Sequence, residues 1–150
     1  MGKERNKPMK MDCEFDICEV LNKPLFAHLA THSPDGPRES PVWFLWEDSA
    51  LWFIGSTRDS FPKRIKADGR CAVGIVDFDL AGGFLRHVGF RGFATVEALD
   101  SKRLVRFLHR YLGAPSEWNP KFKTEIIDGL DLMIKFTPST IIARDQSYFK

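Results

Sequence analysis

Hydrophobic and polar residues alternate along several short segments of this 150-residue chain. Every second residue from Leu25 to Thr31 falls on the same face of an extended chain, as in a half-buried strand. Runs rich in β-branched and aromatic residues also occur at 40–46, 51–56, 71–78, 84–99 and 132–144. Turn residues at 33–36 and 47–49 separate the first three runs. The pattern therefore predicts six strands, the first three joined as antiparallel hairpins.

Helical spacing of apolar residues predicts three or four short helices, at 12–22, 59–68, 101–112 and 117–128. Ser60 is expected to cap the second of these helices, and Asp100 to cap the third, which Gly113 ends. The first three strands have no helix between them, which argues against a parallel α/β sheet. We therefore expect a mainly β protein with short helices, built as a six-stranded antiparallel barrel.

Composition places the chain among ordinary globular proteins, with 43% hydrophobic and 28% charged residues. Residues 1–11 are predicted to be a disordered basic lead, and residues 12–150 a single domain. We expect no signal peptide and no membrane span, because no apolar run approaches about 20 residues. Three cysteines without zinc-ligand spacing indicate reduced thiols, and hence a cytoplasmic location.

Charge and aromatic content bear on the partners of the chain. A formal net charge of +2 disfavours a nucleic-acid-binding barrel, although 13 Phe and 4 Trp could supply stacking platforms. His28 and His32 share a strand face but lack a third ligand nearby, so no metal site is predicted. The basic side of the helix at 100–112 is expected to face water, with an acidic partner or a second subunit as the alternative.

The segment 55–64 combines a strand end, hydroxyl residues, a helix start and two cations. Its candidate anion ligands are Ser56, Thr57, Ser60, Lys63 and Arg64. Hydroxyl donors, free amides and cationic side chains together suit a phosphate group. The alternative is that Ser60 only caps the helix, while the two cations only face water.

The segment Pro41-Val42-Trp43-Phe44 could border a flat heteroaromatic ring. Such a ring needs an apolar surface and a few fixed backbone donors and acceptors at its polar edge. The alternative is that Trp43 and Phe44 belong to the barrel core or to a dimer interface.

The order of these segments resembles the pyridoxamine 5'-phosphate oxidase-like family of flavin-binding split barrels, over residues 25–144. The resemblance is carried by Leu29-Ala30-Thr31, Asp35-Gly36, Pro41 to Phe44, Leu51-Trp52-Phe53, Ser56 to Arg64, Asp68 to Val73, Arg91-Gly92 and Phe136-Thr137-Pro138. Phe61 stands where some members of the family place Lys.

The resemblance implies a homodimeric FMN-binding split barrel with the cofactor at the subunit interface. Ser56, Thr57, Ser60 and either Lys63 or Arg64 would hold the phosphate, and residues 41–44 would border the isoalloxazine ring. The implied activity is that of an FMN-dependent oxidoreductase acting with a small-molecule electron donor or acceptor, without a side-chain nucleophile or base.

A non-catalytic module of the same fold is the alternative function. It would bind flavin, FAD, deazaflavin or haem, with His28, His32 or His87 as candidate haem ligands.

Overall fold

The computed structural model describes residues 9–114, 116 and 129–148. These residues form eight strands: β1 (Lys10–Cys13), β2 (Ala27–Thr31), β3 (Arg38–Val42), β4 (Leu45–Glu47), β5 (Ala50–Gly55), β6 (Arg70–Asp79), β7 (Phe84–Ala98) and β8 (Leu132–Asp145). They also form three helices: α2 (Cys18–Leu21), α3 (Phe61–Ala67) and α4 (Ser101–Leu112). Within this part of the chain, no helix is long and apolar enough to cross a membrane.

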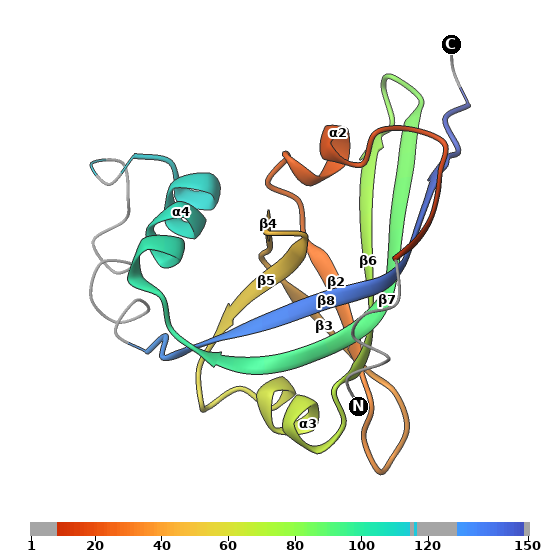
Figure 1. Ribbon diagram of the computed structural model, residues 1–150. Helices are drawn as coiled ribbons and strands as arrows, with labels where there is room; N and C mark the ends of the chain where they lie inside the picture. The colour runs from red at the N-terminus through yellow and green to blue at the C-terminus, as the bar shows by residue number, and fades with distance from the viewer. Residues whose placement is uncertain (1–8, 115, 117–128, 149–150) are drawn as a thin grey trace.

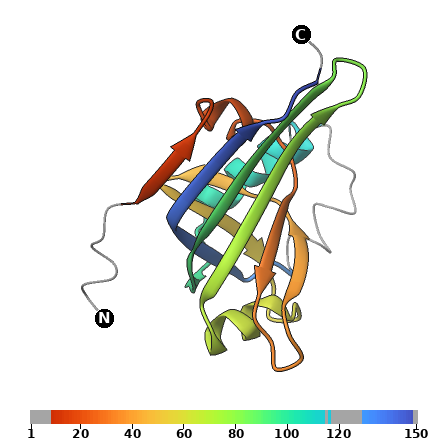
Figure 2. The same ribbon diagram turned by 90° about the vertical axis from the view of Figure 1, so that its right-hand side faces the viewer.

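The strands form one curved sheet in the order β3-β2-β6-β7-β8-β5-β4, and β1 pairs with β8. All pairs are antiparallel except β1 with β8. The long strands β7 and β8 cross the molecule together, with α4 near one end of their ribbon and α3 beneath it (Figure 1). The view in Figure 2 shows β6, β7 and β8 side by side. This arrangement confirms the predicted split barrel with short helices between its strands.

The main core lies inside the curved sheet. Alternate residues of the strands point into it, such as Leu29 of β2 and Ile75 of β6, both fully buried. The largest fully buried side chains of this core include Phe44, Phe53 and Phe136. The two-residue alternation from Leu25 to Thr31 therefore predicts the inward face of β2 correctly.

A second, smaller core lies under α4. Leu104, Phe107 and Leu108 of the helix pack with Trp52 of β5 and Met133 of β8. Both faces of β5 are consequently buried, which explains why its sequence is an almost continuous apolar run rather than an alternating one.

The start and end of α4 follow the sequence prediction. The Asp100 carboxylate accepts the backbone N–H groups of Lys102 at 2.9 Å and Arg103 at 3.3 Å. Gly113 ends the helix with φ of 77°, in the left-handed region that favours glycine. Contrary to the sequence prediction, the basic side of α4 does not only face water, because Arg103 and Arg106 bind the carboxylate of Glu47 on β4.

The structure differs from the sequence predictions in two places. The helix predicted at 12–22 is only the short α2, because residues 10–13 form β1 along β8; Lys10 and Met11 therefore belong to a strand rather than to a disordered lead. The strand predicted at 40–46 is divided into β3 and β4, and this division together with β1 raises the number of strands from six to eight. The helix predicted at 117–128 and residues 1–8 lie outside the described residues.

Replacing Gly92 with alanine should strongly destabilise the fold. β7 shifts register against β8 between Arg91 and Gly92, and a Cβ at Gly92 would lie 2.2 Å from the carbonyl oxygen of Thr137. We expect Gly92→Ala to lower the free energy of unfolding by about 2–3 kcal/mol, measured by urea denaturation. Gly74→Ala is the matched control, because its nearest neighbour would be the flexible His87 ring at 3.6 Å. Equal stability of the two variants would contradict the close approach at Gly92.

Glu47 should stabilise the fold in a pH-dependent way. Hydrogen bonds from Arg106 and Arg103 hold the pKa of Glu47 below its ordinary value, so the folded state favours the charged carboxylate. This stabilisation is present above the ordinary pKa of glutamate and is lost as the pH falls through the lowered, folded value. Glu47→Gln should therefore lower the free energy of unfolding by about 1–2 kcal/mol at neutral pH, and by less below about pH 4.

Urea denaturation at neutral pH and below about pH 4 measures the difference in the free energy of unfolding between Glu47→Gln and the wild type. Asp48→Asn is the control, because the Asp48 side chain is 77% exposed and lies 3.2 Å from Arg103, and surface pairs contribute little. A loss that stays constant with pH would rule out the charge of Glu47 as its cause.

Candidate functional site

The hydroxyl residues that follow β5 are bound to carboxylates. The backbone N–H and the hydroxyl of Thr57 both donate to Asp131, at 2.9 and 3.0 Å. The N–H of Ser56 donates to Asp59 at 2.8 Å, and its hydroxyl oxygen accepts the N–H of Arg58 at 3.0 Å. These donors hold the turn in place, and the carboxylates beside them would repel an anion. Ser56 and Thr57 therefore serve the turn in this structure.

Helix α3 begins directly after this turn. Pro62 lies in its first turn, and Phe61, Pro62 and Ile65 are buried, which fixes the helix against the barrel. Ser60 occupies the N-cap position as predicted, but its side chain makes no capping hydrogen bond. The Ser60 hydroxyl oxygen instead accepts a hydrogen bond from Arg64 at 2.8 Å.

Arg64 joins three hydroxyl groups from three different elements. Its guanidinium donates to Thr31 at 2.7 Å, to Ser60 at 2.8 Å and to Ser40 at 3.4 Å. Thr31 ends β2, Ser40 lies in β3 and Ser60 precedes α3. We call these four residues the Arg64 cluster. Within the described residues, no carboxylate pairs with Arg64, so its positive charge is not offset by an ion pair.

The Arg64 cluster has the chemistry of an anion site. A guanidinium can only donate, so each hydroxyl oxygen of the cluster accepts from Arg64 and keeps its own proton for another acceptor. A half-buried cation surrounded by hydroxyl donors suits a phosphate group.

Lys63 lies apart from the Arg64 cluster. It is exposed, and its side chain makes no hydrogen bond or ion pair with any residue that the structure describes. The sequence left Lys63 and Arg64 as equal candidates for a phosphate ligand, and the structure brings only Arg64 together with hydroxyl groups. Thr31 and Ser40 were missed as candidate ligands, although the Leu29-Ala30-Thr31 segment carried part of the family resemblance.

Among the strands that the structure describes, β3 pairs only with β2 and lies at a free edge of the sheet, so alternate backbone N–H and C=O groups along it have no partner strand there. Pro41 is exposed and Val42 is half-buried at the end of this strand, close in sequence to Ser40 of the Arg64 cluster. An edge of this kind offers the backbone donors and acceptors that the polar edge of a planar ring requires.

Trp43 and Phe44 are held by Tyr111 of α4. The ring of Trp43 stacks on the ring of Tyr111, with centroids 4.6 Å apart and planes within 2°. The hydroxyl of Tyr111 accepts the N–H of Phe44 at 3.0 Å and donates to the carbonyl of Leu25 at 2.6 Å. Burial raises the pKa of Tyr111, which keeps this donor protonated.

The two aromatic residues therefore have different roles. Phe44 is fully buried in the main core, so its side chain cannot border a ligand on the surface of this chain, as the core alternative expected. Trp43 is only half-buried, so part of its side chain remains accessible to solvent.

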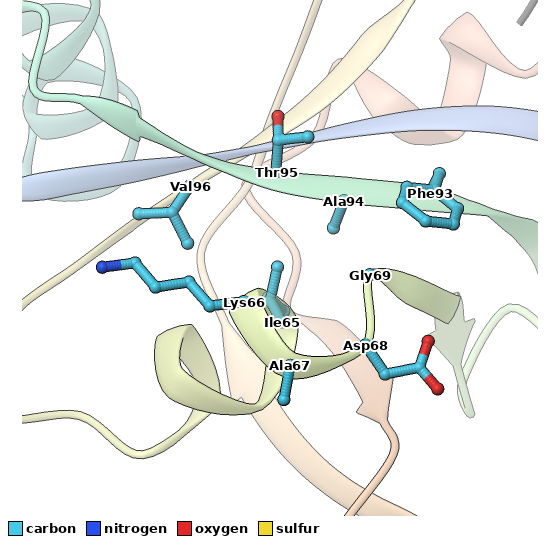
Figure 3. Close-up of a pocket in the computed structure, with 9 residues that line it drawn as sticks. All are labelled: Ile65, Lys66, Ala67, Asp68, Gly69, Phe93, Ala94, Thr95 and Val96. Carbon is cyan, nitrogen blue, oxygen red and sulfur yellow. The ribbon is translucent and has the colours of Figure 1, made fainter. Parts of the chain in front are cut away.

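A hollow of about 440 Å³ lies at the opposite end of α3, between residues 65–69 and 93–96. Figure 3 shows Ile65 and Ala94 pointing toward one another, whereas the charged ends of Lys66 and Asp68 extend to opposite sides. No set of polar groups converges in this hollow among its labelled residues, so it does not suit a phosphate.

In the part of the chain that the structure describes, the other candidate chemical groups do not assemble into a catalytic set. Among the described residues, no three His, Cys, Asp or Glu side chains gather as a metal site. His28 pairs with Glu39 at 2.6 Å on the exposed face of the sheet. Burial raises the pKa of the Cys71 thiol to about 11, so this thiol is not a nucleophile at neutral pH.

Comparison with solved structures shows the same fold in other proteins. A conserved hypothetical protein of Mycobacterium tuberculosis aligns with a TM-score of 0.69 and 20% identity, covering 93% of this chain and 90% of that one. An F420 reductase aligns with a TM-score of 0.60 and 25% identity, covering 83% and 94%. An FAD-binding protein of Mesorhizobium loti aligns with a TM-score of 0.61 and 17% identity, covering 86% and 91%.

Sequence comparison identifies the family. No curated protein sequence matches the chain. A sequence profile described as pyridoxamine 5'-phosphate oxidase matches residues 16–145, which include every described helix and strand except β1. The chain therefore belongs to the pyridoxamine 5'-phosphate oxidase family.

Proposed function

We propose that the chain is an FMN-binding, flavin-dependent oxidoreductase that holds the cofactor phosphate at the Arg64 cluster. The observation that carries this proposal is the half-buried guanidinium of Arg64, which contacts three hydroxyl groups and no carboxylate among the described residues. A phosphate at this point would receive charge-assisted hydrogen bonds from Arg64 and the protons of the neighbouring hydroxyls.

The free edge of β3 would border the flavin ring. Pro41 and Val42 follow Ser40 in β3, and Trp43 comes directly after the strand, so consecutive residues of the chain would bind the phosphate and the ring. Their contribution is to bind and orient the ring, and stacking on Tyr111 keeps Trp43 in a fixed position. The flavin, when bound, supplies the hydride or electron transfer that no side chain of the site provides.

A deazaflavin is the second candidate cofactor. It is favoured by the likeness to an F420 reductase, which covers most of both chains. The FAD-binding neighbour extends the same argument to FAD. All of these cofactors carry a phosphate on the side chain of the ring, so the Arg64 cluster would serve each of them in the same way.

The homodimer, the cytoplasmic location and the small-molecule electron partner stay predictions. One feature that favours a second subunit is the set of exposed apolar residues at one end of the sheet: Phe26, Val76, Phe78 and Leu80. A non-catalytic binding module remains the alternative function, and measurement of turnover separates the two.

Substitution of Arg64 tests the phosphate assignment. We expect Arg64→Gln to weaken FMN binding by about 10-fold to 100-fold, because it removes a charged hydrogen-bond donor. Lys63→Gln is the matched control, because it removes the same charge one residue away and should leave the affinity nearly unchanged. Equilibrium titration followed by flavin fluorescence measures both.

Riboflavin lacks the phosphate and supplies the second control. Its affinity should be the same for the wild type and for Arg64→Gln, so that the variant loses only the part of FMN affinity that the phosphate provides. If Arg64→Gln weakens riboflavin and FMN equally, Arg64 supports the fold of the site and does not bind phosphate.

The purified protein should carry the visible absorption of an oxidised flavin. We expect the FMN-loaded protein to be reduced by a nicotinamide donor and reoxidised over many cycles, as followed by absorbance. Parallel titrations with FMN, FAD and F420 should show the tightest binding for FMN. Tight binding without reduction by any donor would replace the enzyme with the binding module.

A further inference from the structure

A second hollow, of about 450 Å³, lies over β2, β6 and β7 and is lined by more cationic groups than the first. Its lining includes Thr31, His32, Arg70, Arg91 and Ser139. We call this hollow the Arg91 pocket. Ala30 and Ala72, which form a registered pair on the side of the sheet facing away from the core, also line the pocket and leave space above the strands.

The two arginines of the Arg91 pocket differ in whether a carboxylate pairs with them. Arg70 binds both carboxylate oxygens of Asp68, at 3.0 and 2.7 Å, and this pairing lowers the pKa of Asp68. Arg91 is exposed, and its side chain makes no hydrogen bond or ion pair with the residues that the structure describes. Of the two arginines in this pocket, Arg91 is therefore the one without a carboxylate partner in the described part of the chain.

Three contacts and constraints hold the backbone around Arg91 in place. β7 changes register against β8 between Arg91 and Gly92, and such irregularities re-aim a side chain away from the ordinary alternation. The hydroxyl of Ser139 donates to the carbonyl of Arg91 at 3.1 Å. Gly92 leaves no room for a side chain, since its Cβ would meet the backbone of Thr137 and Pro138.

We propose that the Arg91 pocket binds a phosphate or carboxylate group, with Arg91 as its principal ligand. An unpaired guanidinium beside a second arginine, over a floor of methyl groups, favours an anion of small size. The pocket is distinct from the Arg64 cluster, but Thr31 borders both, because its hydroxyl accepts from Arg64. The anion is either a separate small molecule or a second anionic group of a bound cofactor.

Titration with inorganic phosphate tests the pocket, using the isotope-labelled full chain and amide NMR signals. Signals of residues beside Arg91 should shift and saturate, and Arg91→Gln should weaken this binding at least about tenfold. Lys102→Gln is the matched control, because it removes one exposed positive charge on α4 and should change nothing. Unshifted signals beside Arg91, or equal saturation in Arg91→Gln, would overturn the proposal.

The same titration on cofactor-loaded protein identifies the source of the anion. If the ligand is a separate molecule, phosphate binds equally well with and without FMN or FAD. If it is the second phosphate of FAD, then FAD abolishes the phosphate response and Arg91→Gln weakens FAD but not FMN. Either result supports the pocket. Arg64→Gln should leave the response beside Arg91 intact, so a failure at the Arg64 cluster is recognised separately.

Discussion

The pairing of β7 with β8 is the constraint on which the rest of the structure depends. β7 binds β6 along its first part and β8 along most of its length, while β8 also binds β5 and β1. The β7–β8 ribbon therefore connects the strands β3, β2 and β6 on one side of the sheet with β5 and β4 on the other. The register of this ribbon decides which side chains enter the two cores. The irregularity at Gly92 allows this ribbon to bend, because only glycine fits beside the backbone of β8 there.

The arginine side chains on α4 differ in their partners from Arg64 and Arg91. Arg103 and Arg106 bind Glu47, and Arg110 donates to the backbone carbonyl of Leu21, so their charges fasten α4 to the barrel. Arg64 instead contacts neutral hydroxyls, and the Arg91 side chain makes no hydrogen bond or ion pair with the residues that the structure describes. A charge that the fold does not neutralise is available to a ligand, which is why the two proposed anion sites centre on Arg64 and Arg91.

Tyr111 links the position of α4 to the candidate site. Its hydroxyl fixes the backbone at Phe44, and its ring supports Trp43, so the end of β3 cannot move independently of the helix. The break between β3 and β4 occurs at these residues, where the chain leaves the edge of the sheet for the core. The apolar segment at 41–44 is thus divided between the exposed Pro41, the half-buried Val42 and Trp43, and the fully buried Phe44.

The sequence by itself determined the barrel class, most strands, the cap of α4 at Asp100 and the order of segments that marks the family. Each of these depends on residues close together in the chain, so periodicity and spacing reveal them. Only the tertiary structure decided that Arg64, rather than Lys63, meets hydroxyl groups. Thr31 lies 33 residues and Ser40 24 residues before it, and the β2–β3 hairpin brings them to α3. Asp131, which accepts hydrogen bonds from Thr57, lies 74 residues after Thr57 in the sequence. Contacts over such distances depend on how strands and helices pack, and no local pattern encodes them.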